Sequence, residues 1–354
     1  MTKFAIVEKI TINDIARLTG LSKGTVDRVL HNRGEVSKKS YEKVMSVIRE
    51  KGYEPNLYAS LLARTSHRTI AILLPKPLPG SYWDLAISGV EKATEDERQF
   101  GIETALFTYD EFRADSFRDV CTRVLESKPS GVVIAPMFQY ETQIFVQELG
   151  ARQIPYVFVD TKLDSPDGHL AFFGIPSYKS GYLCADMLLQ GDKAKEVLIV
   201  RIMRDKERQS DPTVLRRAGF QDYMRENNPG CTIRSLFINP TDAEATDEAL
   251  SAFFEEFPKV RHIVMFNSRI HLIVPYLERY PIPGMRIIGF DNLEANIRAL
   301  KNGTVSMLIA QHPEKQVQEA IRTLSEFLVF QRKPETPDNH MHMDLLTRYN
   351  VEDY

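Results

Sequence analysis

Apolar side chains near the start of the chain recur every three or four residues, which is the spacing of an amphipathic helix. Three short stretches show this pattern, separated by polar residues and glycine. Their apolar positions are Ile12, Ile15, Ala16 and Leu18, then Val26, Val29 and Leu30, then Tyr41, Val44 and Ile48. The pattern predicts three short helices around one small shared core.

Capping residues mark where these helices begin and end. Thr11 followed by Asp14 has the form of a capping box, in which the carboxylate also suits the positive end of a helix. Gly20 suits the left-handed residue that ends the first helix, and Ser22 and Ser37 can cap the next two. Two helices joined by a tight turn and followed by a third predict a helix-turn-helix unit.

From Thr69 onward the pattern changes to short, continuous apolar runs separated by segments of helical length. The runs are TIAILLP, IETALFTY, GVVIAPM, IPYVFVD, EVLIVRI, HIVMFN and MRIIGFD. Such alternation predicts parallel sheets covered by helices on both faces. The runs form two groups, one ending near Asp160 and one from about Glu196 to Asp291, so we expect two doubly wound α/β lobes with a ligand cleft between them.

Length and composition fit a cytoplasmic protein of two or three folding units. The 354 residues are 43% hydrophobic and 26% charged, and the apolar runs are far below the ~20 residues that cross a bilayer. The opening segment MTKFAIVEKITIND is interrupted by Glu8 and Lys9, unlike a secretory signal. Cys121, Cys184 and Cys231 are far apart and lack CxxC spacing, which argues against disulfides and zinc.

Charge is distributed unevenly along the chain. Residues 1–68 contain 13 basic and 7 acidic side chains, a net charge of +6, whereas the remainder carries −9. A basic head on an acidic body predicts an anionic partner for the head alone.

In a helix-turn-helix unit the second helix enters the major groove of DNA. Here its first turns would present Lys23, Gly24, Asp27 and Arg28. Lys and Arg can donate to guanine or to phosphate. Gly24 either permits close approach to DNA or is simply tolerated, and Asp27 would be repelled by phosphate unless it pairs with Arg28 or accepts from cytosine. The alternative is a small helical domain that binds protein.

The next stretch, GYEPNLYASLLAR, completes a resemblance to the lactose-repressor (LacI-type) family of bacterial transcriptional regulators. The chain departs from the family pattern at Leu21, usually Val, and at Asp27, usually Ser. It matches at Thr11, Asp14, Ala16, Gly20, Ser22, Thr25, Val26, Arg28, Val29, Leu30, Val36, Ser37, Gly52, Tyr53, Pro55, Asn56, Ala59 and Leu62. From the helix-turn-helix geometry and the resemblance together, we expect DNA contacts from Thr11, Ser22, Lys23, Gly24, Thr25, Asp27, Arg28, Asn32, Asn56 and Leu62.

The same resemblance gives NLYASLLA a role as a hinge helix that folds on operator DNA. Leu62 matches the family's leucine that wedges into a minor-groove base step, where the cost of unstacking is repaid by bending the site. Alternatively, Leu61 and Leu62 pack within an ordinary linker helix. A segment of about eight residues is too short to be stably helical alone, which favours a helix that depends on a partner.

Over the body of the chain the resemblance implies a sensor like the periplasmic binding proteins, with a ligand between its lobes. Asp160 ends the run YVFVD, Arg216 precedes Gly219 in LRRAGF, and Asn267 ends IVMFN. Asp291 lies in GFDN, and Gln311 lies in IAQHP on a crossover between lobes. These match the positions at which family members bind sugars.

A cyclic polyol needs paired donors and acceptors around its rim and a flat apolar wall. Arg, Asp and Asn supply the first, and Tyr82 with Trp83 could supply the wall. Two departures, Ser268 for the family's usual Asp and Pro176 for a usual polar residue, imply a ligand unlike that of the best-known members. Each position also has another interpretation: Asp160 or Asp291 as a helix cap, Trp83 as core, or Arg216 paired with Asp222.

The expected organisation is a helix-turn-helix domain over 10–54, a hinge helix or linker over 55–66, and an effector-binding domain over 68–350. In that domain we expect an N-terminal lobe over about 68–174 and 312–333. The other lobe would span about 175–310 and 335–350. His340 and His342 could share one strand face, but without a third ligand in reach a surface strand is favoured over a metal site.

We therefore expect a DNA-binding transcriptional regulator that acts as a homodimer on a near-palindromic, double-stranded operator. Its operator affinity would respond to a small-molecule effector, a sugar or a sugar-like compound. No cofactor, metal or membrane partner is expected, and no GxGxxG, GxxxxGK or HExxH motif supports an enzyme. The alternative is a solute-binding protein without regulatory output.

Overall fold

The computed structural model describes five stretches of the 354-residue chain, residues 12–30, 36–51, 67–163, 168–202 and 212–353. The chain divides into two compact units, Met1–Ser66 and His67–Tyr354. Four of the expected DNA contacts lie outside the described stretches, and the hinge helix stays a prediction. They are Thr11, Asn32, Asn56 and Leu62.

The first unit contains three helices, α1 (Ile12–Thr19), α2 (Lys23–Leu30) and α3 (Lys38–Lys51). Gly20 ends α1 with φ at 67°, and the Leu21 amide donates to the Ala16 carbonyl at 3.1 Å, which is a glycine-based helix stop. The small core consists of Ile15, Val26, Val29 and Val44. Leu18 and Tyr41, expected on the apolar faces, are instead exposed at the edges of those faces.

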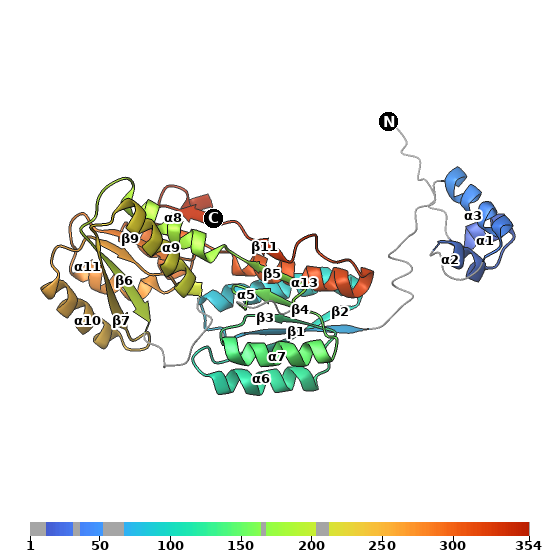
Figure 1. Ribbon diagram of the computed structural model, residues 1–354, viewed down its shortest axis with the longest axis horizontal. Coiled ribbons are helices and arrows are strands. Elements are labelled where there is room, and N and C mark those ends of the chain that lie inside the picture. The colour runs from blue at the N-terminus through green and yellow to red at the C-terminus, as the bar shows by residue number, and fades with distance from the viewer. Residues whose placement is uncertain (1–11, 31–35, 52–66, 164–167, 203–211, 354) are drawn as a thin grey trace. The chain divides into compact units, whose positions relative to one another are not determined.

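The first lobe of the second unit is built on a six-stranded parallel sheet, in the order β11-β5-β4-β3-β1-β2. Its strands are β1 (Arg68–Pro75), β2 (Ile102–Tyr109), β3 (Gly131–Ile134), β4 (Tyr156–Val159), β5 (Ala171–Gly174) and β11 (Asp338–His340). Figure 1 shows helices over both faces of this sheet. They are α5 (Tyr82–Glu97) with α13 (Pro313–Phe330), and α6 (Ala114–Glu126) with α7 (Gln139–Ala151).

The second lobe repeats this plan on a sheet in the order β12-β10-β9-β8-β6-β7, where only β12 runs antiparallel. Its strands are β6 (Glu196–Ile202), β7 (Thr232–Ile238), β8 (His262–Val264), β9 (Arg286–Phe290), β10 (Met307–Ala310) and β12 (Asp344–Leu346). Its helices are α8 (Ser177–Leu189), α9 (Pro212–Asn227), α10 (Ala243–Glu256), α11 (Val274–Arg279) and α12 (Glu294–Lys301). Short 3-10 turns are η1 (Arg98–Phe100) in the first lobe and η2 (Ile270–Leu272) and η3 (Val351–Asp353) in the second.

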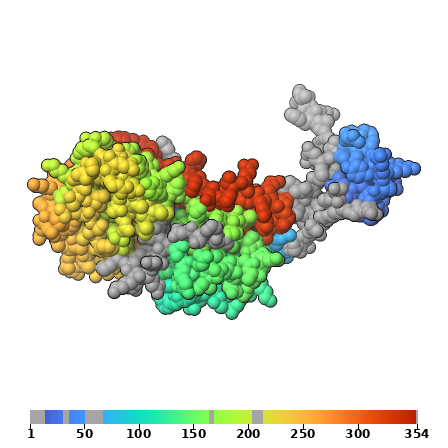
Figure 2. Space-filling model, in the orientation of Figure 1, coloured from blue at the N-terminus to red at the C-terminus, as the bar shows by residue number. Residues whose placement is uncertain are grey.

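Buried apolar side chains fill both faces of both sheets. The residues from Ile70 to Leu74 in β1 are all fully buried, as a central parallel strand requires. The two lobes have separate cores, and Figure 2 shows them as two masses, one teal to green and one yellow to orange. The predicted architecture of a helical head and two doubly wound lobes is confirmed.

The chain crosses between the sheets after β5, after β10 and after β11. The last crossing differs from the expected boundary near 334, because β11 pairs with β5 in the first sheet before the chain reaches β12. Asp338 lies opposite Phe172, and the Phe172 amide donates to the Pro337 carbonyl at 2.7 Å. This edge strand satisfies backbone groups of β5 that would otherwise be unpaired.

His340 closes β11, whereas His342 lies beyond the end of that strand. Among the described residues, no group of three or more His, Cys, Asp or Glu side chains is placed to hold a metal ion. Within the same stretches, no helix has both the length and the apolar character needed to span a bilayer.

Candidate functional site

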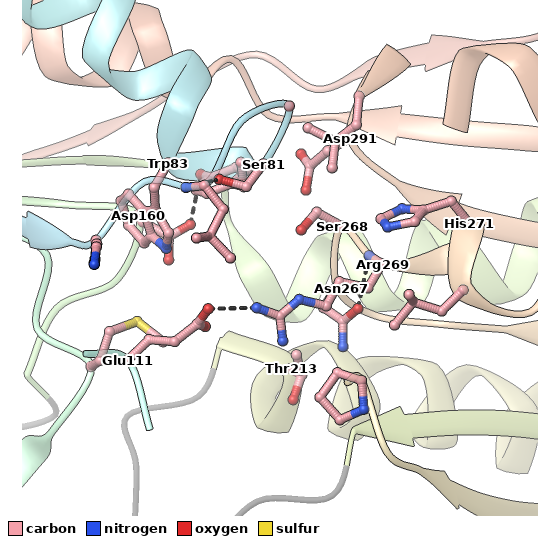
Figure 3. A pocket seen from close by; sticks show the side chains of 18 of the residues that line it. Ser81, Trp83, Glu111, Asp160, Thr213, Asn267, Ser268, Arg269, His271 and Asp291 are labelled. Atoms are coloured by element: carbon pink, nitrogen blue, oxygen red, sulfur yellow. Dashed lines mark hydrogen bonds and ion pairs between the residues drawn. The ribbon is translucent and has the colours of Figure 1, made fainter. Parts of the chain in front are cut away.

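A cavity of about 320 Å³ lies between the two lobes, where the carboxyl ends of strands from both sheets meet (Figure 3). All seven residues expected to contact an effector line it. They are Tyr82, Trp83, Asp160, Arg216, Asn267, Asp291 and Gln311. The structure thus brings together side chains from both lobes. That they bind an effector stays a prediction.

A chain of buried hydrogen bonds crosses the floor of this cavity. The Tyr82 hydroxyl donates to Asp160 Oδ1 at 2.8 Å, and the Asp160 amide donates to Gln316 Oε1 at 2.9 Å. Gln316 Nε2 donates to the Gln311 carbonyl at 2.9 Å. Gln311 Nε2 in turn donates to both carboxylate oxygens of Asp291, at 2.9 and 3.0 Å. Polar side chains from the two lobes are therefore held in one network.

Arg216 is almost fully buried on α9, with 1% of its surface exposed. Its Nη1 donates to the Phe266 carbonyl at 2.7 Å, and its Nη2 donates to Gln311 Oε1. Its Nε has no hydrogen-bond partner within the described part of the chain. Pairing with Asp222, the other interpretation of this arginine, is wrong, because Asp222 accepts from Tyr178 and Arg225.

Asp160 and Asp291 follow strands β4 and β9, and both have backbone φ angles in the left-handed region, at 66° and 68°. Burial raises the pKa of Asp291 to about 7, against the lowering effects of Arg216 and the Gln311 hydrogen bond. Burial and then the charge of Asp160 raise the pKa of Tyr82, so its hydroxyl stays a donor. In the cavity network, Asp160 accepts from the Tyr82 hydroxyl and Asp291 accepts from the Gln311 side-chain amide.

The aromatic pair stands at the start of α5, directly after β1. The rings of Tyr82 and Trp83 meet edge to face, with centroids 5.0 Å apart. Trp83 belongs to the core of the first lobe and also lines the cavity. Its role as a wall for a ligand stays a prediction.

Several cavity residues were missed by the sequence interpretation. Glu111 follows β2 and Arg269 follows β8, and their side chains form an ion pair of 2.5 Å across the cavity mouth (Figure 3). His271 shares a hydrogen bond of 3.0 Å with Asn296, and burial lowers its pKa. A position just after a strand was the signal that could have found Glu111 and Arg269. Gln316, inside α13, belongs to the hydrogen-bond network rather than to the cavity lining, and it carried no such signal.

In the first unit, Ser22 caps α2. Its Oγ accepts from the Thr25 amide at 3.2 Å and lies 2.9 Å from the Thr25 hydroxyl. Lys23, Gly24 and Arg28 are exposed on the same helix, whereas Thr25 and Asp27 are half-buried. A Cβ at Gly24 would come within 4 Å of Ser22 Oγ alone, so the described residues do not require glycine there.

Comparison with known families matches both units. The description "Bacterial regulatory proteins, lacI family" matches residues 11–56, and "Periplasmic binding protein domain" matches residues 70–332.

Individual relatives agree with these matches. The chain is 31% identical to the sucrose operon repressor of Staphylococcus xylosus over 51% of its own length, and it spans about half (52%) of that relative. It is 30% identical to the HTH-type transcriptional regulator AscG of Escherichia coli K12, over 80% of this chain and 82% of AscG.

Among solved structures, a Bacteroides fragilis protein assigned as a LacI transcriptional regulator is similar with a TM-score of 0.76 and 37% identity. The likeness covers 82% of this chain and all of that one. These matches account for both the helical head and the two-lobed body. The chain belongs to the lacI family of bacterial regulatory proteins.

Proposed function

We propose that this lacI-family regulator binds operator DNA through α2 and responds to a sugar or sugar-like effector held between the lobes by the seven cavity residues. The observation that carries the proposal is the cavity itself. It joins carboxylates, amides, a buried guanidinium and two aromatic rings, the groups that recognise a polyol. Its volume of about 320 Å³ suits a small ligand.

The unpaired donor on Arg216 Nε supports a ligand rich in acceptors, because a buried N–H without a partner is costly. Asn267 and the carboxylates of Asp160 and Asp291 supply acceptors for hydroxyl groups. The name of the Staphylococcus relative, a sucrose operon repressor, further supports a carbohydrate.

The active assembly is proposed to be a homodimer, with one basic head on each half of a near-palindromic operator. Effector binding would favour one arrangement of the lobes, and operator binding would favour one arrangement of the heads. By linkage, each ligand would then change the affinity for the other. A solute-binding protein without regulatory output would lack the helix-turn-helix unit, and the relatives are regulators rather than enzymes.

The test is thermal unfolding of the full-length protein against mono-, di- and phosphorylated sugars and cyclitols. An effector at 100 times its Kd should add ~2.7 kcal/mol of stability, seen as a higher Tm. Silence across the panel would contradict a carbohydrate effector.

Arg216→Ala should abolish this response because it removes the donor at the centre of the network. Asn267→Ala changes a half-buried residue of the cavity lining, and it tests the same loss of response if the arginine variant does not fold. Arg225→Ala is the matched control on the exposed face of α9. Undiminished binding by both cavity variants would show that the residues are assigned wrongly.

A further inference from the structure

The loop between β2 and α6 reaches from the first lobe onto the second. Its Phe112 packs against the apolar core that α10, α11 and β8 contribute to in the second lobe. Its Glu111 pairs with Arg269 of the second lobe, 158 residues away in the chain. The Arg269 guanidinium also lies 5.4 Å from the centre of the Phe112 ring. One short loop therefore makes an ionic, an apolar and a cation–π contact between lobes.

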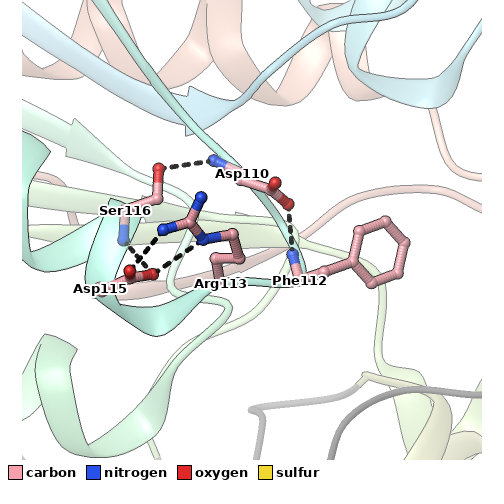
Figure 4. A network of polar contacts seen from close by, with 5 residues as sticks. All are labelled: Asp110, Phe112, Arg113, Asp115 and Ser116. Carbon is pink, nitrogen blue, oxygen red and sulfur yellow. Dashed lines mark hydrogen bonds and ion pairs between the residues drawn. The ribbon is translucent and has the colours of Figure 1, made fainter.

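Local hydrogen bonds hold this loop in shape (Figure 4). Asp110 Oδ1 accepts from the Phe112 amide at 2.9 Å, and the Asp110 amide donates to Ser116 Oγ at 3.0 Å. Arg113 and Asp115 pair through two hydrogen bonds, of 3.2 and 2.6 Å. Because the backbone is fixed in this way, Glu111 and Phe112 lose little additional freedom when they contact the second lobe.

The receiving side is equally constrained. The Arg269 amide donates to Asn267 Oδ1 at 3.0 Å, which orients a side chain that lines the cavity. Asn296 Nδ2 donates to the Ser268 carbonyl at 2.9 Å and fixes the loop from behind. Arg269 is thus joined both to the opposite lobe and to the cavity wall.

The ion pair is partly withdrawn from water, since the Glu111 and Arg269 side chains are only 16% and 23% exposed. The attraction between charges in such surroundings is screened less by salt and water than the attraction within a surface ion pair. Removing Glu111 takes the carboxylate partner away from the partly desolvated Arg269 charge. The ion pair between Glu111 and Arg269 is therefore strong only while the two lobes stay together and keep water away from it.

We propose that Glu111, Phe112 and Arg269 form an interlobe clasp, which holds the cleft closed and slows escape of whatever occupies it. All three residues line the cavity, so an occupant touches the clasp directly. The proposal rests on the proposed function only in taking this cavity as the effector site. It assigns closure to residues distinct from the buried network that recognises the ligand.

Trp83 provides a reporter, because it is the single tryptophan, lines the cavity and is 7% exposed. Acrylamide quenching of its fluorescence in the full-length protein measures how open the cleft is, without any effector. Glu111→Arg and Arg269→Glu should each raise the quenching constant by about twofold or more, since each places like charges together and shifts the population toward open states.

The double variant, Glu111→Arg with Arg269→Glu, should restore a constant near that of the wild type. Arg279→Glu, which breaks an ion pair with Asp247 inside the second lobe, is the control and should change nothing. Unchanged quenching in the single variants would overturn the proposal, and so would a double variant as open as the singles. If a charge reversal prevents folding, Glu111→Gln should still raise quenching in the same direction.

This experiment separates the clasp from the effector assignment. Restoration in the double variant together with a silent sugar panel would keep the clasp and remove the carbohydrate effector. A sugar that binds, with no change in quenching for either single variant, would keep the effector site and remove the clasp.

Discussion

Asp291 is a carboxyl group placed where its charge is disfavoured. It is 1% exposed, and burial raises its pKa to about 7 although Arg216 and Gln311 favour the ionised form. Near neutral pH the group therefore exists in both protonation states. A ligand that donates hydrogen bonds would favour the carboxylate, whereas burial favours the acid.

Asp291→Asn should change the pH dependence of stability. The folded pKa of about 7 exceeds the ordinary value of 3.8, so the folded state binds more protons between these values. The stability contributed by this group is then fully present below pH 3.8 and is lost as the pH rises through about 7. The amide variant should lack that loss and gain on the wild type by up to ~1.4 kcal/mol per pH unit in this window.

Urea unfolding of both proteins at about pH 5 and pH 8 measures this difference. Asp222→Asn is the control, because Tyr178 and then Arg225 lower the pKa of that half-buried carboxyl. An Asp291→Asn variant with the same relative stability at both pH values would contradict a raised pKa.

At the residue scale, the sequence shows which polar side chains follow a strand, but it does not show which hydrogen-bond partners they have. Asp160, Asn267 and Asp291 each follow a predicted strand, and parallel strands bring those positions to one edge. Gln316 joins the same network from the first turns of α13, where periodicity shows only one polar residue among many. Its role depends on how α13 packs against the first sheet, which is a tertiary property.

At the scale of elements, α8 and α9 approach so closely that glycine is required in both. A Cβ at Gly181 would lie 1.8 Å from the Arg216 carbonyl, and one at Gly219 would lie 2.0 Å from the Tyr178 carbonyl. The two backbones are therefore in contact at the turn of α9 that carries Arg216. The crossing of these helices positions the guanidinium in the cavity.

Gly181→Ala should destabilise the protein although alanine favours helix. The gain in helix propensity is ~1 kcal/mol, whereas forcing backbones apart in a packed interior typically costs about 1–3 kcal/mol or more. Displacement of α9 should also weaken effector binding through Arg216. Gly150→Ala in α7 is the matched control, because its Cβ would meet nothing within 4 Å. Urea midpoints should fall for the first variant and hold or rise for the second, and a rise in both would contradict the close crossing.

Most strands that the sequence pattern predicted are buried along nearly their whole length, and β2, an edge strand with exposed positions, is the exception. All seven apolar runs coincide with strands, from β1 to β9. The pattern missed β7, an edge strand whose exposed and half-buried residues interrupt the apolar run. It also missed β5 and β10, which are buried strands of four residues. It missed β11 and β12, three-residue strands at sheet edges, and so placed the last crossing too early. A strand that is very short or has exposed positions gives a short apolar run, which the pattern alone does not distinguish from part of a buried helix.

At the scale of the whole molecule, the two units have opposite charge and separate cores. Residues 1–68 carry a net charge of +6 and the remainder −9, and this contrast could be predicted because counting charge needs no fold. The contact between Glu111 and Arg269 could not, because 158 residues separate them and only the packing of two lobes unites them. The basic unit is also where the lacI family description matches.

Operator binding by the full-length protein should therefore depend steeply on salt. Each phosphate that a Lys or Arg neutralises contributes about −0.9 to the slope of log K against log salt, because counterions are released. Lys23 and Arg28 are exposed on α2. If they contact phosphate, Lys23→Ala and Arg28→Ala should each reduce the slope by about 1, whereas loss of a base contact would leave the slope and change sequence preference.

The measurement is fluorescence anisotropy with duplexes selected from a random library, over a range of salt concentrations. The control is Arg225→Ala, which removes a basic residue from the acidic body and should leave the slope unchanged. A slope near zero for the wild type would show that the head does not act on the DNA backbone. The helix-turn-helix unit would then be interpreted as a protein-binding domain, because a steep fall of DNA affinity with salt comes from the release of counterions.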